Sequence, residues 1–351
     1  MARPAEDRRP PRKLPRPLEL PRGAAMMSQM DQIDVFNGDA DGICALAQLR
    51  QAEPRDSRLV TGVKRDIELV ARAAAGDGDR LTVLDLSFDK NRAAVLAALD
   101  AGAEVFYVDH HFAGEIPDHP RLRTRIDTSA ETCTSLLVDR HVEGRFAAWA
   151  VTGAFGDNLD VSARRRAGEL GLDDAQQDLL RRLGTSINYN GYGESVADLW
   201  FDPADLFARL RSFASPFDFV AEDPQTFATL EAGYRDDLAK ARALPAAEAG
   251  DEAAVFVLPD EAWSRRVSGV YGNELANESP QRAHAVLTLR RDGNYVVSVR
   301  APLARRRGAD ELCRRFPTGG GRAAAAGINA LPSDRLDDFV AQFRRTFARD
   351  Q

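Results

Sequence analysis

The most constraining feature of this sequence is a series of short β-rich runs between residues 31 and 130. Four of them read "IDVFN", "RLVTGV", "LTVLDLS" and "EVFYVDHH". Between them lie stretches such as "AVLAALDAG", whose apolar spacing is typical of an amphipathic helix. Alternation of strands with helices indicates parallel strands joined by crossover helices. We therefore expect an α/β fold built on a parallel sheet.

Carboxylates follow these runs in a regular way. Asp39 and Asp41 come after "IDVFN", Asp85 follows "LTVL", and Asp109 follows "EVFYV". In an open parallel sheet, the carboxyl ends of the strands line the crevice where ligands bind. Three strands are therefore expected to bring four carboxylates to one rim.

A carboxylate cluster of this kind needs positive charge, because like charges a few ångströms apart raise one another's pKa values. Divalent cations supply that charge. His110 and His111 directly follow Asp109, and Asp157 in "AFGDN" offers a further carboxylate. A mixed set of carboxylates and imidazoles suits two octahedral Mn²⁺ ions, with Mg²⁺ as the alternative, better than tetrahedral Zn²⁺ or an all-oxygen Ca²⁺ site.

Taken singly, each motif has a simpler explanation. The D-x-D-G stretch is more often a turn than a ligand pair, and a lone acid at a strand end, such as Asp85, is usually a helix cap. Paired histidines are harder to dismiss, since the chain has five histidines in all and two of them adjoin Asp109. Recurrence of acids at successive strand ends favours the metal site.

The rest of the chain is expected to be helical and then α/β again. From about residue 131, "ETCTSLLVDRHVEG" and "RFAAWAVTGAFGDNLD" have helical patterns, the first capped by its own Thr and Ser side chains. Residues 162–183 and about 201–246 are also helical in pattern and bracket the loop "TSINYNGYGES". Strands return in "AAVFVLP" and on both sides of the D-G turn in "HAVLTLRRDGNYVVSVRAP". A final helix follows "TGGGRAAAAGINALP".

Composition is that of a globular protein with two domains. The chain has 351 residues, of which 44% are hydrophobic, enough to bury a substantial core. Cys44, Cys133 and Cys313 lack C-x-x-C spacing and are expected to be small buried residues in a reducing compartment. Because there is no apolar run near the roughly 20 residues that span a bilayer, and no secretory signal, we expect a cytoplasmic protein without membrane association.

Charge is distributed unevenly along the chain. A net charge of −7 argues against a general binder of duplex DNA. Residues 1–30 carry 7 basic and 3 acidic side chains, residues 31–250 carry 24 and 38, and residues 251–351 carry 16 and 13. This distribution suits an acidic, metal-binding region at 31–250 followed by a basic, anion-binding region at 251–351. Charged surface residues distributed by chance would explain it equally well. Residues 1–30, rich in Pro and Arg, are expected to be disordered and are assigned no function.

The motifs resemble, in order, those of the DHH phosphoesterase superfamily, which includes RecJ-type exonucleases, oligoribonucleases and cyclic-dinucleotide phosphodiesterases. They are "NGDADG", "LDLS", "VDHH" and "TGAFGDN", and "TGGGRAAAAG" is similar to the glycine-rich motif of the associated DHHA1 domain. The resemblance covers roughly residues 31 to 345. It implies a DHH catalytic domain over 31–200, a helical linker over 201–250 and a smaller α/β DHHA1 substrate-binding domain over 251–347.

The resemblance also implies roles for individual residues. The metal ligands would be Asp39, Asp41, Asp85, Asp109, His110 and Asp157. Asp85 would bridge the two ions and, with His111, serve in catalysis, since His111 would face the substrate phosphate or assist proton transfer. In the second domain, phosphate would be held by Arg300, Gly319, Gly320, Gly321 and Arg322, with the glycines leading into a helix N-terminus.

Two positions depart from the family pattern. Many relatives carry histidine where Asn37 stands, and GGGH where this chain has Arg322. Asn37 offers a carbonyl oxygen, a weaker neutral ligand, so one metal ion is expected to bind more loosely. Arg322 keeps a donor for phosphate but cannot shuttle protons, because its pKa is too high.

The leading hypothesis is a Mn²⁺-dependent phosphoesterase that acts on short oligonucleotides, dinucleotides or small nucleotides. The alternatives are a RecJ-like single-strand exonuclease and a non-catalytic DHH-fold module that binds a nucleotide or a protein. Tyr189 and Tyr192 could stack on bases, although packing within their loop explains them as well. The sequence leaves the substrate and the oligomeric state open, with a dimer as one option.

Overall fold

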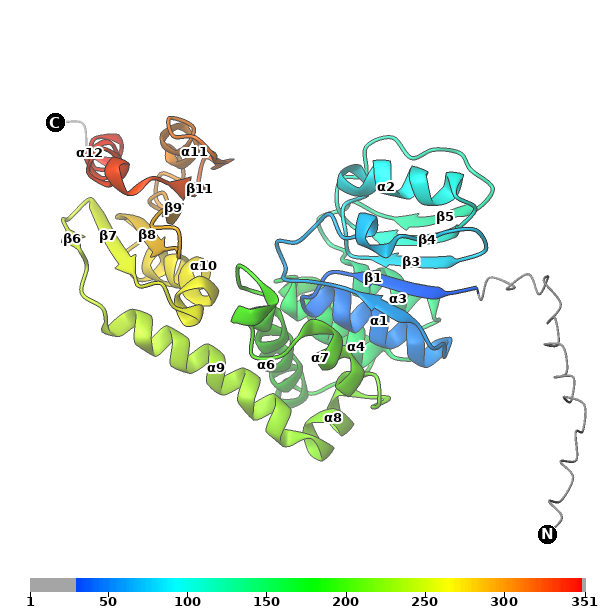
Figure 1. Cartoon of the computed structure of the whole chain (residues 1–351). Coiled ribbons are helices and arrows are strands. Elements are labelled where there is room, and N and C mark those ends of the chain that lie inside the picture. The colour runs from blue at the N-terminus through cyan, green and yellow to red at the C-terminus, as the bar shows by residue number, and fades with distance from the viewer. Residues whose placement is uncertain (1–29, 349–351) are drawn as a thin grey trace, which may run out of the picture.

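A computed structural model describes residues 30–348 and shows two lobes, each built on its own sheet (Figure 1). The sheet of the first lobe has five parallel strands in the order β2-β1-β3-β4-β5. These strands are β1 (Gln32–Phe36), β2 (Arg58–Val60), β3 (Arg80–Leu84), β4 (Glu104–Asp109) and β5 (Leu122–Ile126). The expected parallel sheet is confirmed, and β5 is an edge strand that the sequence patterns did not reveal. The expected disorder of residues 1–30 concerns residues that lie outside the described part of the chain, except for Met30.

Helices cover both faces of this sheet (Figure 1). α2 (Phe88–Asp100) lies on one face, and α1 (Ala40–Ala52) and α3 (Thr134–His141) lie on the other. The remaining helices of this lobe pack against the layer that contains α1: α4 (Ala147–Gly156), α5 (Asp160–Glu169), α6 (Asp174–Asn190), α7 (Pro203–Leu210) and α8 (Pro216–Glu222). Ile33 and Val35 of β1 belong to the core beneath α2, whereas Phe36 packs into the core formed with α1, α4 and α6. Both faces of β1 are buried, so it carries three apolar residues, and its buried Asp34 is compensated by an ion pair with Arg50 at 2.5 Å.

The helical region differs from expectation in two places. The stretch 162–183 is divided between α5 and α6, because Asp173 and Gln176 form a capping box that starts a new helix. The segment "TSINYN" is the end of α6 and not a loop. There Tyr189 is buried and donates to Asp237, 2.8 Å away, and Asn190 donates to the carbonyl of Phe201. Buried hydrogen bonds to distant residues therefore extend the helix beyond its local pattern.

The second lobe contains a six-stranded sheet in the order β10-β11-β9-β8-β7-β6. The strands are β6 (Glu248–Ala249), β7 (Ala253–Leu258), β8 (Ala283–Leu289), β9 (Tyr295–Arg300), β10 (Gly319–Arg322) and β11 (Ala325–Leu331). Three helices accompany them: α10 (Ala262–Glu278), α11 (Ala309–Cys313) and the final helix α12 (Leu336–Phe347). The expected hairpin of β8 and β9 and the expected C-terminal helix are confirmed.

The glycine-rich motif forms a β-hairpin, so the helix N-terminus expected after it was wrong. Residues 319–322 make the edge strand β10, and the alanines that follow enter β11, which pairs with β9. Strand pairing overrides the helix preference of alanine. Glycine is required at 319, because a Cβ there would lie 1.8 Å from the carbonyl oxygen of Cys313.

The helix α9 (Pro224–Ala243) joins the two lobes (Figure 1). Buried ion pairs fix the second lobe against it and against the first lobe. Arg266 of α10 lies 2.7 Å from Asp237 of α9, and Arg265 lies 2.9 Å from Asp198. Among residues 30–348, no helix is both long enough and apolar enough to cross a membrane. The three cysteines are buried free thiols, as expected.

Candidate metal centre

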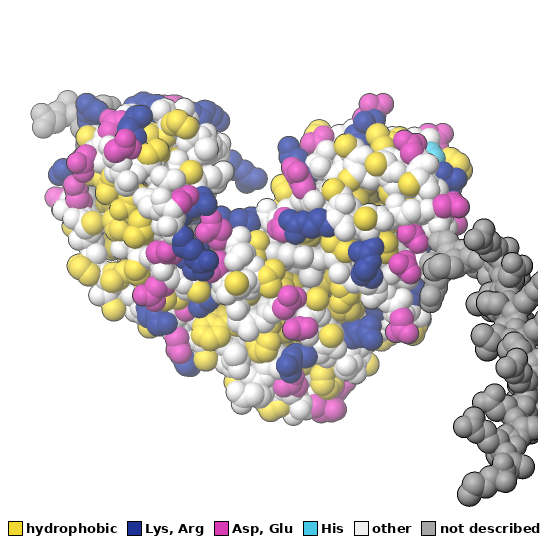
Figure 2. All heavy atoms as spheres, in the orientation of Figure 1, with side chains coloured by type: hydrophobic (Ala, Val, Ile, Leu, Met, Phe, Trp, Pro, Cys, Tyr) yellow, Lys and Arg dark blue, Asp and Glu magenta, His cyan; other side chains and the backbone are white. Residues whose placement is uncertain are grey.

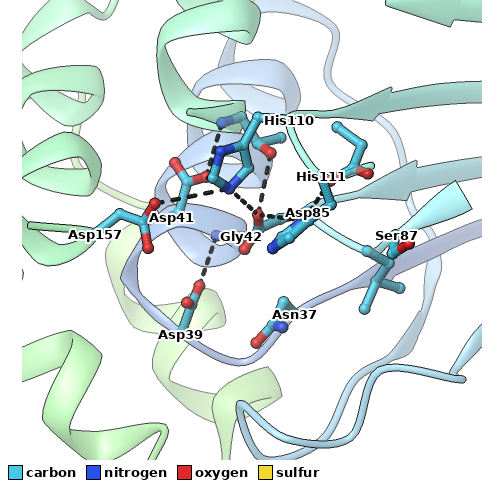
Figure 3. A network of polar contacts seen from close by, with 12 residues as sticks. Asn37, Asp39, Asp41, Gly42, Asp85, Ser87, His110, His111 and Asp157 are labelled. Atoms are coloured by element: carbon cyan, nitrogen blue, oxygen red, sulfur yellow. Dashed lines mark hydrogen bonds and ion pairs between the residues drawn. The ribbon is translucent and has the colours of Figure 1, made fainter. Parts of the chain in front are cut away.

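The carboxyl ends of β1, β3 and β4 meet at one rim, on the side of the sheet that faces the second lobe (Figure 1). The four strand-end carboxylates, Asp39, Asp41, Asp85 and Asp109, are all at most 2% exposed there. Asp157, the residue that ends α4, reaches the same rim from the helical layer (Figure 3). The structure therefore brings together the acids that the strand-end pattern indicated.

His110 stands at the centre of this cluster (Figure 3). Its Nε2 lies 3.5 Å from Asp85 Oδ1, 3.6 Å from Asp157 Oδ2 and 3.9 Å from Asp41 Oδ2. Two sets of three residues bring their potential ligand atoms together, and within each set these atoms lie within 4.8 Å of one another. One set is Asp85, His110 and His111, and the other is Asp41, His110 and Asp157. Oxygen and imidazole nitrogen in these groups are ligand types suited to Mn²⁺.

Asp41 also holds a helix in place. Its two oxygens each accept a backbone N–H from the first turn of α3, from Thr134 and from Ser135, both at 2.7 Å. The expectation that α3 is capped by its own Thr and Ser side chains was therefore wrong, since a carboxylate far away in the sequence takes that role. Thr134 Oγ1 instead donates to Asp85 Oδ1 at 3.1 Å. The positive end of α3 thus lies against the acidic cluster.

The carboxylates strongly perturb one another. Burial, followed by the charges of Asp39, Asp41, Asp157 and Asp109, raises the pKa of Asp85 well above its ordinary value. Burial and the charges of Asp41 and Asp39 raise the pKa of Asp157 to about 6. Asp85 also has a left-handed backbone, with φ of +59°, a strained conformation of the kind found at functional sites. Because the raised pKa values of Asp85 and Asp157 favour their protonated forms, a cation that binds here would displace these protons.

Two buried oxygens beside the cluster are not paired with any described residue. Asn37 Oδ1 and Asp109 Oδ2 have no hydrogen-bond partner among the described residues. Buried polar atoms are nearly always paired in folded proteins, so such atoms call for a water or an ion. Together with the nitrogen and oxygen donors around His110, they show that the residues present fit a divalent cation.

His111 differs from His110 in its surroundings. Its Nδ1 lies 2.7 Å from Asp109 Oδ1, and its side chain is 46% exposed, whereas that of His110 is 17% exposed. The hydrogen bond to Asp109 raises the pKa of His111, against the opposing effect of burial. His111 is therefore a partly exposed imidazole whose protonated form is stabilised at the rim.

Lys64 is a member of the cluster that the sequence patterns missed. Its Nζ lies 2.5 Å from Asp39 Oδ2, 2.9 Å from Asn188 Oδ1 and 3.5 Å from Asp157 Oδ1. Although burial alone would raise the pKa of Asp39, the Lys64 ammonium and the N–H of Gly42 lower it. Lys64 follows β2, whose carboxyl end lies at the same rim, so applying the strand-end rule to cations would have found it.

A cavity of about 360 Å³ lies between the lobes, close to this centre. Tyr192 and Arg65 line it from the first lobe, and Asn273 and Arg300 from the second. Asn188, which accepts from Lys64, also donates to the hydroxyl of Tyr192 at 3.1 Å, so hydrogen bonds connect the cavity wall to the rim. Figure 2 shows the hollow between the lobes, with basic side chains along its sides.

The residues expected to bind substrate are divided in the structure. Arg300 donates hydrogen bonds to the side chains of Asn273 and Ser298 and to two backbone carbonyls. All of these acceptors are neutral, so no carboxylate among the described residues balances the positive charge of Arg300. Gly319, Gly320 and Gly321 lie in the edge strand β10, whose outer side is unpaired among the described residues. Arg322 is exposed at the end of that strand.

Comparison with known proteins identifies the fold. No protein-family model and no curated protein sequence matches the chain. Two crystal structures of the exonuclease RecJ with manganese are similar over 92% of this chain, with TM-scores of 0.60 and 0.59 and sequence identities of 18% and 19%. The chain has a RecJ-like fold of two α/β lobes. The expected fold is therefore confirmed.

The coverage of these similar structures varies. The chain covers 91% of the first RecJ structure and 53% of the second, which is RecJ from Thermus thermophilus. A pGpG-specific phosphodiesterase, PggH from Vibrio cholerae, has a TM-score of 0.51 and 16% identity, with 90% of this chain and 98% of that chain covered. At these identities the similarity is one of fold.

Proposed function

We propose that this chain is a Mn²⁺-dependent phosphoesterase, with Mg²⁺ as the alternative ion, that cleaves phosphoester bonds in dinucleotides, short oligonucleotides or small nucleotides. The observation that carries this proposal is the buried carboxylate and imidazole cluster beside a cavity with arginines on its walls. The fold of RecJ with manganese and of the phosphodiesterase PggH supports it.

One ion would be held by Asp85, His110, Asp41 and Asp157. Asp39, Asp109 and Asn37 are the further residues that the sequence pattern assigned to a site for two ions. When bound, a divalent cation lowers the pKa of a coordinated water and stabilises the charge that develops at phosphorus. The described residues provide the positioning: α3 fixes Asp41 through two N–H groups, and Thr134 fixes Asp85.

His111 is the proposed proton donor. Its Nδ1 is held by Asp109, which leaves Nε2 as the nitrogen available to a substrate. Because this contact raises the pKa of His111, the imidazolium persists to higher pH and can protonate a departing alkoxide oxygen.

Cationic and aromatic side chains are the proposed substrate-binding groups. Arg300 and Arg65 line the cavity, and neither pairs with a carboxylate within residues 30–348. Arg322 and the unpaired edge of β10 would supply further donors to phosphate. Tyr192 borders the cavity, and Phe112, which follows His111 directly, is 73% exposed and can stack on a base. Tyr189 is buried against Asp237 and is excluded from this role.

Domain limits and cellular context are part of the proposal. We assign the catalytic domain to residues 31–200, the linker to 201–250 and the substrate-binding domain to 251–347. The cytoplasm is the proposed compartment, in keeping with three buried free thiols. Partners would be nucleic acid or nucleotide substrates, and light scattering would measure the oligomeric state, for which a dimer is one option.

The proposal is tested by a substrate panel with the purified chain and Mn²⁺. The panel contains dinucleotides, oligomers of several lengths, cyclic dinucleotides, 3′-phosphoadenosine 5′-phosphate and pyrophosphate. Release of phosphate or mononucleotide from at least one of them is expected, with the shortest phosphodiesters preferred. The matched control is the double variant Asp109→Ala, His110→Ala. Metal-dependent release from none of these substrates, or release undiminished in the control, contradicts the proposal.

A further inference from the structure

The ammonium of Lys64 occupies a cation position made by three elements of the first lobe. Asp39 comes from the start of α1, Asn188 from α6 and Asp157 from the end of α4, and their oxygens lie 2.5, 2.9 and 3.5 Å from Nζ. The ammonium donates hydrogen bonds to Asp39 and Asn188 and forms an ion pair with Asp157, so two of its three N–H donors are used within the described residues. The site is thus already filled by a positive charge of the chain itself.

Lys64 also uses an oxygen that a metal ion would need. Asp39 Oδ1 accepts from the N–H of Gly42 at 3.0 Å, and Asp39 Oδ2 is in contact with Lys64. Asp39 accordingly belongs to neither of the two groups of close donor atoms, which both contain His110. The donors left for a divalent ion therefore lie on the His110 side of the cluster.

The lysine is anchored and is not a mobile surface side chain. Its backbone N–H donates to the carbonyl of Gly191 at 2.8 Å, and its carbonyl accepts from Asn37 Nδ2 at 3.2 Å. Its side chain is 28% exposed. Asn37 thus directs its amide nitrogen to the Lys64 backbone, which makes it a positioning residue for the lysine.

We propose that Lys64 is a built-in cation of the metal centre, so that the chain binds one Mn²⁺, on the His110 side, where the sequence pattern indicated two. The inference rests on the proposed function, since it concerns the same site. The contact with Asp157 is an ion pair at 3.5 Å and not a hydrogen bond, so the third N–H of the ammonium can point to a phosphate oxygen of the substrate. Lys64 would then take over the charge-stabilising role of a second ion.

Metal stoichiometry tests this inference without an activity assay. The full chain is stripped with chelator, dialysed to equilibrium against Mn²⁺, and analysed for bound metal and by electron paramagnetic resonance. The wild type is expected to bind about one Mn²⁺ per chain with the spectrum of an isolated ion. Lys64→Ala and the longer Lys64→Gln are expected to bind about two, with the spectrum of a spin-coupled pair.

Two controls make the result specific. Lys90→Ala removes an exposed lysine of α2 that lies 3.9 Å from Asp89, and it should bind as much metal as the wild type. Circular dichroism establishes that each variant is folded. Two Mn²⁺ ions on the wild type, or one on both folded Lys64 variants, overturns the inference. Absence of bound Mn²⁺ from the wild type instead contradicts the proposed function, so the two failures are distinguishable.

Discussion

His111 Nδ1 lies 2.7 Å from Asp109 Oδ1, and His110 is the one residue between them in the chain. This contact links the last residue of β4 to a half-exposed imidazole at the rim. Since the hydrogen bond raises the pKa of His111, the imidazolium is available above the ordinary histidine value of 6.5.

If His111 donates a proton, kcat falls as pH rises through its raised pKa. His111→Gln is expected to lower kcat by about 10²-fold or more and to remove this alkaline decline. The measurement is a pH profile of kcat at saturating Mn²⁺. His119→Gln, which changes a histidine in the loop before β5, is the matched control. A variant at 111 that keeps the wild-type profile would show that another group supplies the proton.

The metal-free protein is expected to lose stability as pH rises from about 4. Asp157, with a folded-state pKa of about 6 against 3.8, retains a proton that the unfolded chain has lost, so the free energy of unfolding falls between these values. Asp85, with its raised pKa, acts in the same direction. The contribution of His111 is present below pH 6.5 and is lost as pH passes its raised pKa.

Mn²⁺ removes this loss, because the cation replaces the protons. The rise in unfolding temperature on adding Mn²⁺ to chelator-treated protein should therefore be larger at pH 8 than at pH 5. In Asp157→Asn, the metal-free profile should be flatter between pH 4 and 6. An equal rise at both pH values would disprove the coupling of these carboxylates to the ion.

Asp41 and Asp157 are expected to respond differently to the same change. Asp41→Asn leaves one acceptor oxygen for two N–H groups of α3, so the metal-free protein should lose about 1–3 kcal/mol of stability. Asp157→Asn removes a carboxylate with a raised pKa and should leave metal-free stability at pH 8 unchanged or higher. Urea unfolding measures both, and calorimetry should show weaker Mn²⁺ binding in each. Equal stability losses would refute the helix-anchoring role of Asp41.

Arg300 is expected to affect substrate and not metal. Arg300→Gln removes an uncompensated charge from the cavity wall and should lower kcat/KM by about 10- to 100-fold, mainly through KM. Mn²⁺ affinity should stay at the wild-type value. The control is Arg335→Gln, whose arginine pairs with Asp338 on the surface. A loss of Mn²⁺ affinity in Arg300→Gln would place this residue in the metal centre instead.

Much of the site could be predicted because it depends on a topological rule. Parallel strands present their carboxyl ends at one edge, so Asp39, Asp85 and Asp109 could be placed together from their positions after β-rich runs. The anchoring of α3 by Asp41 could not, because the two ends of that contact are 93 and 94 residues apart. The residues 319–322 were misjudged for a similar reason, since pairing of β11 with β9 outweighs local alanine preference.

The most direct test of the account is hydrolysis of a 5′-phosphorylated dinucleotide by the wild type and by Asp85→Asn, each with Mn²⁺ and with excess chelator. Asparagine tolerates the left-handed backbone at this position, so the variant should fold. Mononucleotide is expected from the wild type with Mn²⁺ and from no other condition. Release that persists in chelator, or at the wild-type rate in Asp85→Asn, would contradict the assignment of this rim as a metal-dependent phosphoesterase centre.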